Sequence, residues 1–117
     1  MIAQLLRDLG YRVLPCATFK HVKDTVNALV EPPIGVLLDL GIAPDVKSKE
    51  SLECGRDCGI WLRTQQHTRD VPIIAYTGFD EDIRIPGWCD VFDAKAMIKK
   101  KKDTIKDIAD VIRTHFR

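Results

Sequence analysis

Apolar residues recur at helical spacing in three parts of the chain, and each part carries a helix start or stop signal. Residues 1–9 form an amphipathic pattern that Gly10 ends. Thr18 is placed to cap a helix over residues 19–30, and Asp103 to cap a closing helix. The predicted inward positions are Ile2, Leu5, Leu6 and Leu9, then Phe19, Val22, Val26 and Leu29, and finally Ile105, Ile108, Ala109, Ile112 and Phe116.

Short apolar runs between these helices predict four strands. Residues 34–40 and 71–77 are rich in β-branched side chains and bounded by proline or glycine, which is typical of strands buried on both faces. Residues 11–16 and 90–95 give two shorter strands. Because strands alternate with helices, we expect parallel pairing through right-handed crossovers. The pattern therefore predicts an α/β fold with a parallel sheet between two helical layers.

The remaining segments have weaker patterns. Residues 59–66 predict another helix, with Ile60 and Trp61 inward, and residues 79–88 leave room for at most a turn or two of helix. Residues 41–57 are polar and show neither helical nor alternating periodicity, so they predict an unusually long loop.

Composition narrows the class of protein. A length of 117 residues suits a single domain over residues 1–117, and 45% apolar residues allow a sizeable core. The net charge of +1 gives no argument for nucleic acid or membrane binding, and we interpret the lysines at 99–102 as a solvated connection. No apolar run predicts a membrane span or a signal peptide, so we expect a cytoplasmic protein with four free thiols.

Three polar residues each end a predicted strand. Asp39 lies at the carboxyl end of the run at 34–40, Thr77 ends the run at 71–77, and Lys95 ends the run at 90–95. The carboxyl ends of parallel strands meet at one edge, where ligands of open α/β sheets bind, so we expect the three side chains to converge. A carboxylate acceptor with a hydroxyl and an ammonium group suits a phosphoryl group.

The chain resembles the receiver domain of two-component response regulators in four ordered pieces. These are Leu-Arg-Asp-Leu-Gly-Tyr-Arg-Val at 6–13, Val-Leu-Leu-Asp-Leu at 36–40, Val-Pro-Ile-Ile-Ala-Tyr-Thr-Gly at 71–78 and Asp-Val-Phe-Asp-Ala-Lys at 90–95. The resemblance implies a flavodoxin-like fold with strand order 2-1-3-4-5 and a sensor kinase or other signalling protein as partner. It also implies that Asp39 is the phosphoacceptor, Thr77 the switch hydroxyl, Lys95 the phosphate-binding lysine and Phe92 the aromatic switch residue.

The sequence also departs from the receiver pattern. Receivers carry an acidic pair after their first strand that holds Mg²⁺, and this position falls before Met1, so the pair and the first strand are both missing. The only visible magnesium ligands are Asp39 and the Gly41 carbonyl. The connection after Asp39 is longer than in receivers, and Ala96 replaces the proline that follows the family's lysine.

Three explanations of the missing strand stay open. The protein extends upstream, a second chain supplies the strand, or the sheet rearranges so that residues 11–16 pair directly with residues 34–40.

These features predict a receiver-like signalling module that is not an enzyme and acts through protein–protein contacts. The missing acidic pair argues against phosphorylation of Asp39. One alternative is a ligand-binding domain or small enzyme that uses the same pocket with residues 41–57 as a lid. Another is an interaction module, including a homodimer, formed by strand addition. A zinc site at Cys54 and Cys58 with His67 is a weaker alternative, because no second close pair of ligands is present.

Overall fold

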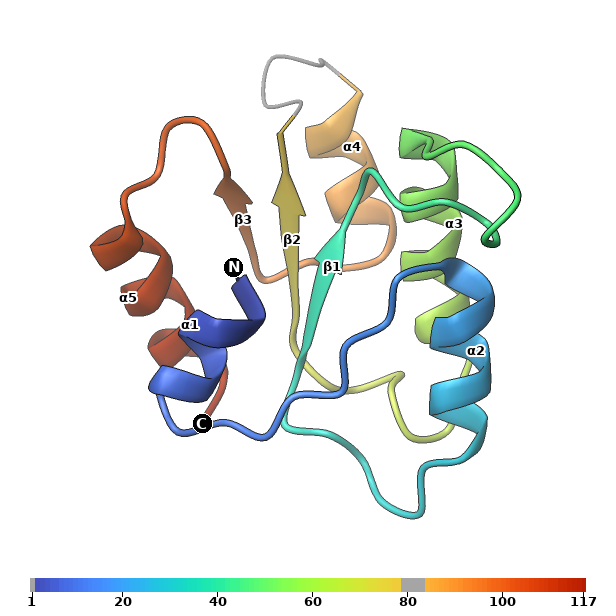
Figure 1. Ribbon diagram of the computed structural model, residues 1–117, viewed down its shortest axis with the longest axis horizontal. Coiled ribbons are helices and arrows are strands. Elements are labelled where there is room, and N and C mark those ends of the chain that lie inside the picture. The colour runs from blue at the N-terminus through green and yellow to red at the C-terminus, as the bar shows by residue number, and fades with distance from the viewer. Residues whose placement is uncertain (1, 79–83) are drawn as a thin grey trace.

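The centre of the molecule is β2 (Ile73–Thr77), which pairs in parallel with β1 (Val36–Asp39) on one side and β3 (Ala96–Lys99) on the other. A computed structural model describes residues 2–78 and 84–117. Figure 1 shows the sheet between two helical layers. The helices are α1 (Ile2–Asp8), α2 (Phe19–Asn27), α3 (Leu52–Leu62), α4 (Ile85–Val91) and α5 (Ile105–His115). The expected parallel α/β sandwich is confirmed.

Alternate residues of the strands point into two separate cores. Ile73 and Ala75 face the core under α2, α3 and α4, whereas Ile74 faces the core under α1 and α5. All three side chains are fully buried. Because both faces of β2 are covered, an almost continuous apolar run is the sequence that this strand requires.

The helix α3 begins earlier than its sequence pattern predicts. Ser51 caps it by accepting a hydrogen bond from the Cys54 N–H at 3.0 Å, so the predicted loop 41–57 ends at residue 50 and the predicted helix 59–66 is displaced. The sequence pattern does not predict the first part of α3 because it contains Gly55 and Gly59, and glycine usually interrupts helices. A Cβ at Gly55 would lie 2.1 Å from the Leu40 carbonyl oxygen, so the close approach of α3 to the end of β1 requires glycine.

Two predicted strands are wrong. Residues 90–95 contain the end of α4 and a turn, and the last strand begins only at Ala96. Residues 11–16 have the composition of a strand, but they form no strand in the structure. They do not pair with β1, so the rearranged-sheet explanation is also wrong; the nearest bridge joins Thr18 to Ala43.

The capping predictions are partly confirmed. The Thr18 hydroxyl accepts the His21 N–H at 3.1 Å at the start of α2. The cap of α5 is Thr104, which forms a capping box with Asp107, and Ile105 is consequently 68% exposed and not inward. Asp103 instead accepts the backbone N–H of Lys99 at 2.8 Å. The other predicted inward residues of this helix are buried: Ile108, Ala109, Ile112 and Phe116.

Two further expectations concern the chain as a whole. In the parts that the structure describes, no helix has the length and apolar character needed to cross a membrane. All four cysteines are free thiols, as expected.

The predicted short helix within residues 79–88 is α4, and residues 79–83 lie outside the described part of the chain.

Candidate functional site

Asp39 and Lys100 form an ion pair at the carboxyl edge of the sheet. Asp39 is the last residue of β1 and Lys100 follows the last residue of β3, so their side chains meet across the end of β2. Lys100 Nζ lies 2.9 Å from Asp39 Oδ2, and the Gly41 N–H donates to Asp39 Oδ1 at 2.9 Å. The Lys100 side chain is 34% exposed and that of Asp39 45%, so the pair is accessible to solvent.

The residues of β2 hold Lys100 in this position. The Lys100 N–H donates to the Thr77 carbonyl oxygen at 2.8 Å, which extends the β2–β3 pairing by one residue. The Lys100 ammonium group also lies 4.4 Å from the centroid of the Tyr76 ring, and Tyr76 is the register partner of Asp39. A cation over a ring face is stabilised by the ring quadrupole. The lysine is therefore positioned by its backbone and by an aromatic face as well as by the carboxylate.

Thr77 ends β2 between the two charged residues and is completely buried. Asp39 and Thr77 thus lie at the carboxyl ends of their strands, where the pattern of strands predicts them. In the pairing of β2 with β3, Thr77 lies opposite Lys99. The proposed roles of Asp39 and Thr77 as phosphoacceptor and switch hydroxyl remain predictions.

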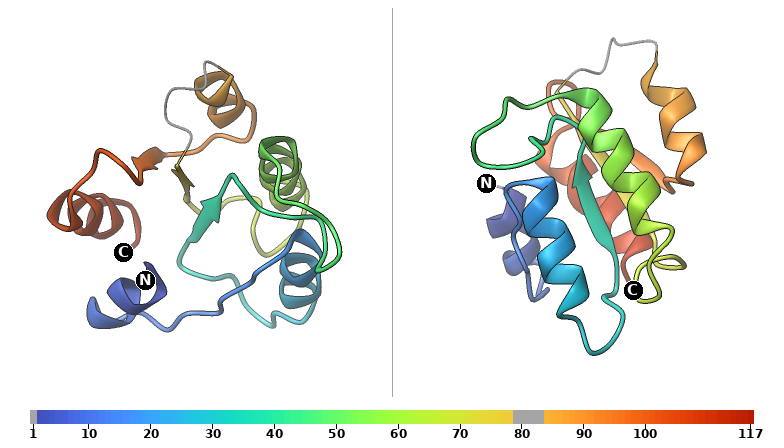
Figure 2. Two further views of the ribbon diagram at one scale, coloured as in Figure 1. Left: turned by 45° about the horizontal axis from the view of Figure 1, so that its top comes forward. Right: turned by 90° about the vertical axis from the view of Figure 1, so that its right-hand side faces the viewer.

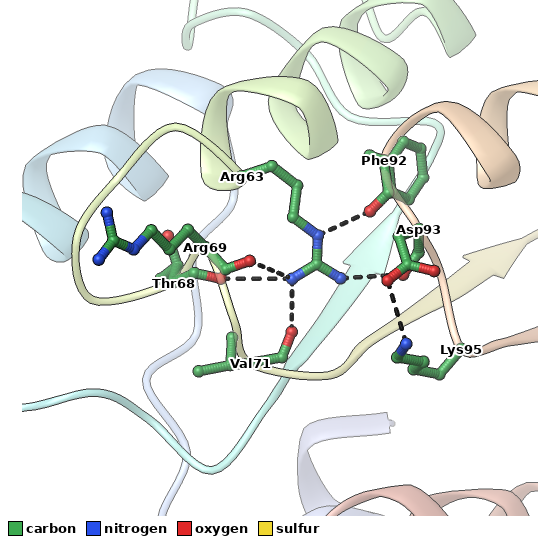
Figure 3. Close-up of polar contacts among 7 residues, drawn as sticks. All are labelled: Arg63, Thr68, Arg69, Val71, Phe92, Asp93 and Lys95. Carbon is green, nitrogen blue, oxygen red and sulfur yellow. Dashed lines mark hydrogen bonds and ion pairs between the residues drawn. The ribbon is translucent and has the colours of Figure 1, made fainter.

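The structure contradicts the predicted position of Lys95. This residue precedes β3, and its N–H donates to the Ile73 carbonyl oxygen at the amino end of the sheet. Its ammonium group pairs with Asp93 at 3.0 Å, beside the backbone carbonyls that surround Arg63 (Figure 3). Lys95 therefore does not converge with Asp39 and Thr77; Lys100 occupies the place that was expected for it. The cause is the misassigned last strand.

Phe92 is likewise in a different place from the one expected of a switch residue. It follows α4, is 1% exposed, and packs so closely on α3 that a Cβ at Gly59 would lie 2.6 Å from its ring. The residue three positions before Lys100 is Met97, which is half-buried in β3 and is not aromatic. An aromatic switch at the carboxyl edge is therefore not formed by Phe92.

Sequence reasoning missed Lys100 because it belongs to a run of four lysines, which usually marks a solvated connection. A usable signal was present in the residues before it. Ala96, Met97 and Ile98 are a short apolar run directly followed by lysines, which matches the arrangement at the ends of β1 and β2.

In the described part of this edge, Asp39 is held by other contacts and no set of oxygen ligands for a divalent cation is formed. Both carboxylate oxygens of Asp39 are engaged, and Gly41 approaches Asp39 through its N–H. Magnesium requires several oxygen ligands, and within residues 2–78 and 84–117 no three side chains of the types that bind metals converge. The same finding leaves the zinc alternative without support. Cys54 and Cys58 are instead buried residues of α3.

An open hollow of about 330 Å³ adjoins the site at Gly41. Its other walls come from the start of α3 and from the residue before α4: Glu50, Ser51, Leu52, Glu53 and Arg84. Arg84 pairs with Glu53 at 2.9 Å, and the pKa of Glu53 is lowered first by its own backbone N–H and then by this guanidinium. Two of the three charged residues that line the hollow, Glu53 and Arg84, thus pair with each other, and Glu50 adds a negative charge.

No family model and no curated protein sequence matches this chain. Several solved structures share its fold, and two of them are receiver or response-regulator proteins. The receiver domain of the sensor histidine kinase PA1611 from Pseudomonas aeruginosa PAO1, with magnesium coordinated in its active-site cleft, is 20% identical with a TM-score of 0.75. That match covers 98% of this chain and 84% of the other. The bacteriophytochrome response regulator RtBRR is 18% identical with a TM-score of 0.70, over 96% of this chain and 66% of the other. The chain therefore has the flavodoxin-like fold of receiver domains.

Proposed function

We propose that this chain is a receiver-like signalling module of a two-component system that acts through protein–protein contacts. The observation that carries the proposal is the pairing of Asp39 with Lys100 across the end of β2, in a chain with the receiver fold. It is supported by a carboxylate, a buried hydroxyl and a lysine at the carboxyl ends of three parallel strands, where Lys100 stands in the place expected for Lys95. The partner is a sensor kinase or another signalling protein.

The geometry favours a module that does not take up phosphate. Phosphoryl transfer to a carboxylate develops negative charge that a metal ion normally neutralises. Here the positive charge nearest to Asp39 is the Lys100 ammonium group, and the described residues provide no ligand set for a metal. In this proposal Asp39 is therefore a residue that contacts the partner protein. Its ion pair with Lys100 holds the carboxyl end of the sheet in a single conformation.

Beryllofluoride with Mg²⁺, and separately acetyl phosphate, test the absence of phosphorylation. We expect no gain of a phosphoryl group by intact-mass spectrometry and no saturable beryllofluoride binding by calorimetry. Lys100→Ala should behave in the same way. Binding that is tight in the wild type and lost in Asp39→Asn would show that the phosphorylation switch operates and would overturn this part of the proposal.

The contact itself is tested against a panel of purified sensor-kinase domains by calorimetry. Asp39→Ala and Lys100→Ala should weaken binding, while Lys95→Ala should leave it unchanged because Lys95 lies at the opposite edge. If no kinase domain binds, or if all three variants bind equally, the signalling role of this edge is wrong.

The hollow beside Gly41 is the one observation that favours the alternative of a ligand-binding domain. The hollow is open to solvent and two of its charged groups, Glu53 and Arg84, already pair with each other, whereas ligand pockets usually enclose most of their ligand. A thermal-shift screen of small molecules distinguishes the two, because a ligand held there raises the melting temperature by mass action.

A further inference from the structure

Half of the backbone groups of β1 face away from the sheet. The N–H groups of Val36 and Leu40 donate to the Pro72 and Tyr76 carbonyl oxygens of the β2 segment, at 2.9 and 3.0 Å. In a parallel ladder successive peptide groups point in opposite directions, so the N–H and C=O groups of Leu37 and Asp39 point to the open side. Within the described residues, β2 is the only strand that neighbours β1.

The side chains of β1 do not protect this edge. Natural edge strands usually carry charges, prolines or bulges that prevent further pairing. The residues Val36, Leu37 and Leu38 are all apolar, and the single charge of the strand is Asp39 at its end. Leu38 is buried at 3% exposure, and Val36 and Leu37 pack on opposite cores. The strand thus has the composition of an interior strand while it occupies an edge.

The two helices that precede this strand in the sequence, α1 and α2, have incompletely covered apolar faces. The helix α2 is strongly amphipathic, yet none of its residues is buried, and α1 buries only Leu6. The half-buried apolar residues fall on both sides of the sheet. On the α2 side they are Phe19, Val22, Val26 and Val36, and on the α1 side Ile2, Leu5, Leu9, Tyr11, Val13 and Leu37. Both cores are therefore unfinished at the β1 edge.

The position of the α1–α2 connection limits what can complete them. In Figures 1 and 2 this connection, residues 9–18, passes on the open side of β1, from the layer of α1 to the layer of α2. Two copies of the chain would have to move two such connections to bring their β1 edges together. A single extended strand displaces only one such connection, and it needs the backbone groups of β1 and apolar contacts on each face.

We propose that the β1 edge binds an extended apolar strand of another polypeptide. The strand pairs with the outward groups of Leu37 and Asp39 over about four residues, the length of β1. Its side chains alternate between the two cores, so it is apolar on both faces and uncharged over this length. The proposal does not use the Asp39 carboxylate or Lys100. It is therefore independent of whether the carboxyl end of the sheet, where these two side chains pair, contacts a kinase.

A synthetic peptide, acetyl-Lys-Lys-Val-Ile-Val-Leu-Val-Lys-Lys-amide, serves as the probe, with backbone hydrogen exchange measured by NMR. In the protein alone we expect the Leu37 and Asp39 amides to exchange at least about tenfold faster than the Leu38 amide. The peptide should slow Leu37 and Asp39 by about tenfold or more and leave Leu38 little changed. A peptide N-methylated at alternate residues cannot pair and should have no effect.

Two side-chain variants provide a matched comparison. Val26→Asp introduces a charge on the half-buried face of α2 and should weaken peptide binding by about tenfold or more. Val30→Asp, at a side chain that is 92% exposed, should not. Absence of peptide protection, equal protection by the N-methylated peptide, or protection that rises with protein concentration without peptide would each overturn the proposal. The last result would identify a second copy as the occupant.

Discussion

Arg63 is a cation that binds backbone carbonyl groups in place of a carboxylate. Figure 3 shows its guanidinium between the loop after α3 and the turn after α4. It donates to the carbonyl oxygens of Thr68, Arg69, Val71, Phe92 and Asp93 at 2.6–3.5 Å. The backbone of Asp93 has a φ of 54°, in the left-handed region that residues other than glycine adopt only occasionally. The guanidinium thus fixes the segments that lead into β2 and β3.

Arg63→Ala should lower the free energy of unfolding by about 2–4 kcal/mol, because several carbonyl groups lose a charged donor. Arg63→Lys should recover only part of this loss, since one ammonium group cannot reach both segments. Urea denaturation measures both variants. Arg69→Ala is the control, because its side chain is 61% exposed and should change stability by less than about 0.5 kcal/mol. Equal stability of Arg63→Ala and wild type would contradict this account.

The Cys58 thiol should be unreactive in the native protein. Its burial, and then the neighbouring thiols of Cys54 and Cys16, raise its pKa to about 12. At pH 8 only about one molecule in ten thousand carries the reactive thiolate. Iodoacetamide followed by peptide mapping should therefore modify the half-buried Cys16 first and Cys58 only after denaturation. Rapid native labelling of Cys58 would show that α3 opens locally.

The site residues separate into those that the sequence identifies and those that it does not. Asp39 and Thr77 were found because each ends a long, β-branched run whose strand character is unambiguous. Lys100 was missed because its strand is only four residues long and ends in lysines. Arg63 gave no signal, because its partners are backbone groups that exist at every position of any sequence.

At the scale of elements, the packing of α3 depends on glycine. Gly55 contacts the backbone of Leu40, and backbone cannot move aside as the end of a flexible side chain can. Sequence patterns interpret such glycines as helix breakers, since the tertiary contact that requires them is invisible locally. For the same reason residues 11–16 have the composition of a strand but no strand structure: β pairing needs a neighbour that local preference does not supply.

Gly55→Ala should destabilise the protein by about 1–3 kcal/mol through overpacking against Leu40. Gly87→Ala is the matched control in α4, where an added Cβ meets no atom within 4 Å. That variant should gain about 0.5–1 kcal/mol from the reduced entropy of the unfolded chain. Thermal unfolding of both variants checks the opposite signs, and destabilisation by both would contradict the assignment of Gly55 as a packing residue.

At the scale of the whole molecule, the sheet is more completely enclosed than the first two helices. Ile73, Ile74 and Ala75 of β2 are fully buried, whereas α2 buries no residue. Native-state hydrogen exchange should therefore be slowest in β2 and occur at global unfolding, while α1 and α2 exchange through smaller openings. Uniform protection of all helices would show that their apolar faces are covered in solution.

The contacts of Phe116 bear on the order in which the chain folds during synthesis. Its ring meets the Tyr11 ring edge-on with centroids 6.3 Å apart, its carbonyl oxygen accepts the Tyr11 hydroxyl at 2.6 Å, and its ring lies where a Cβ at Gly35 would be. Residues 105 positions apart must therefore meet before the segments on either side of β1 are fixed. On the ribosome, the contacts of Phe116 with Tyr11 and Gly35 can therefore form only after residue 116 has emerged.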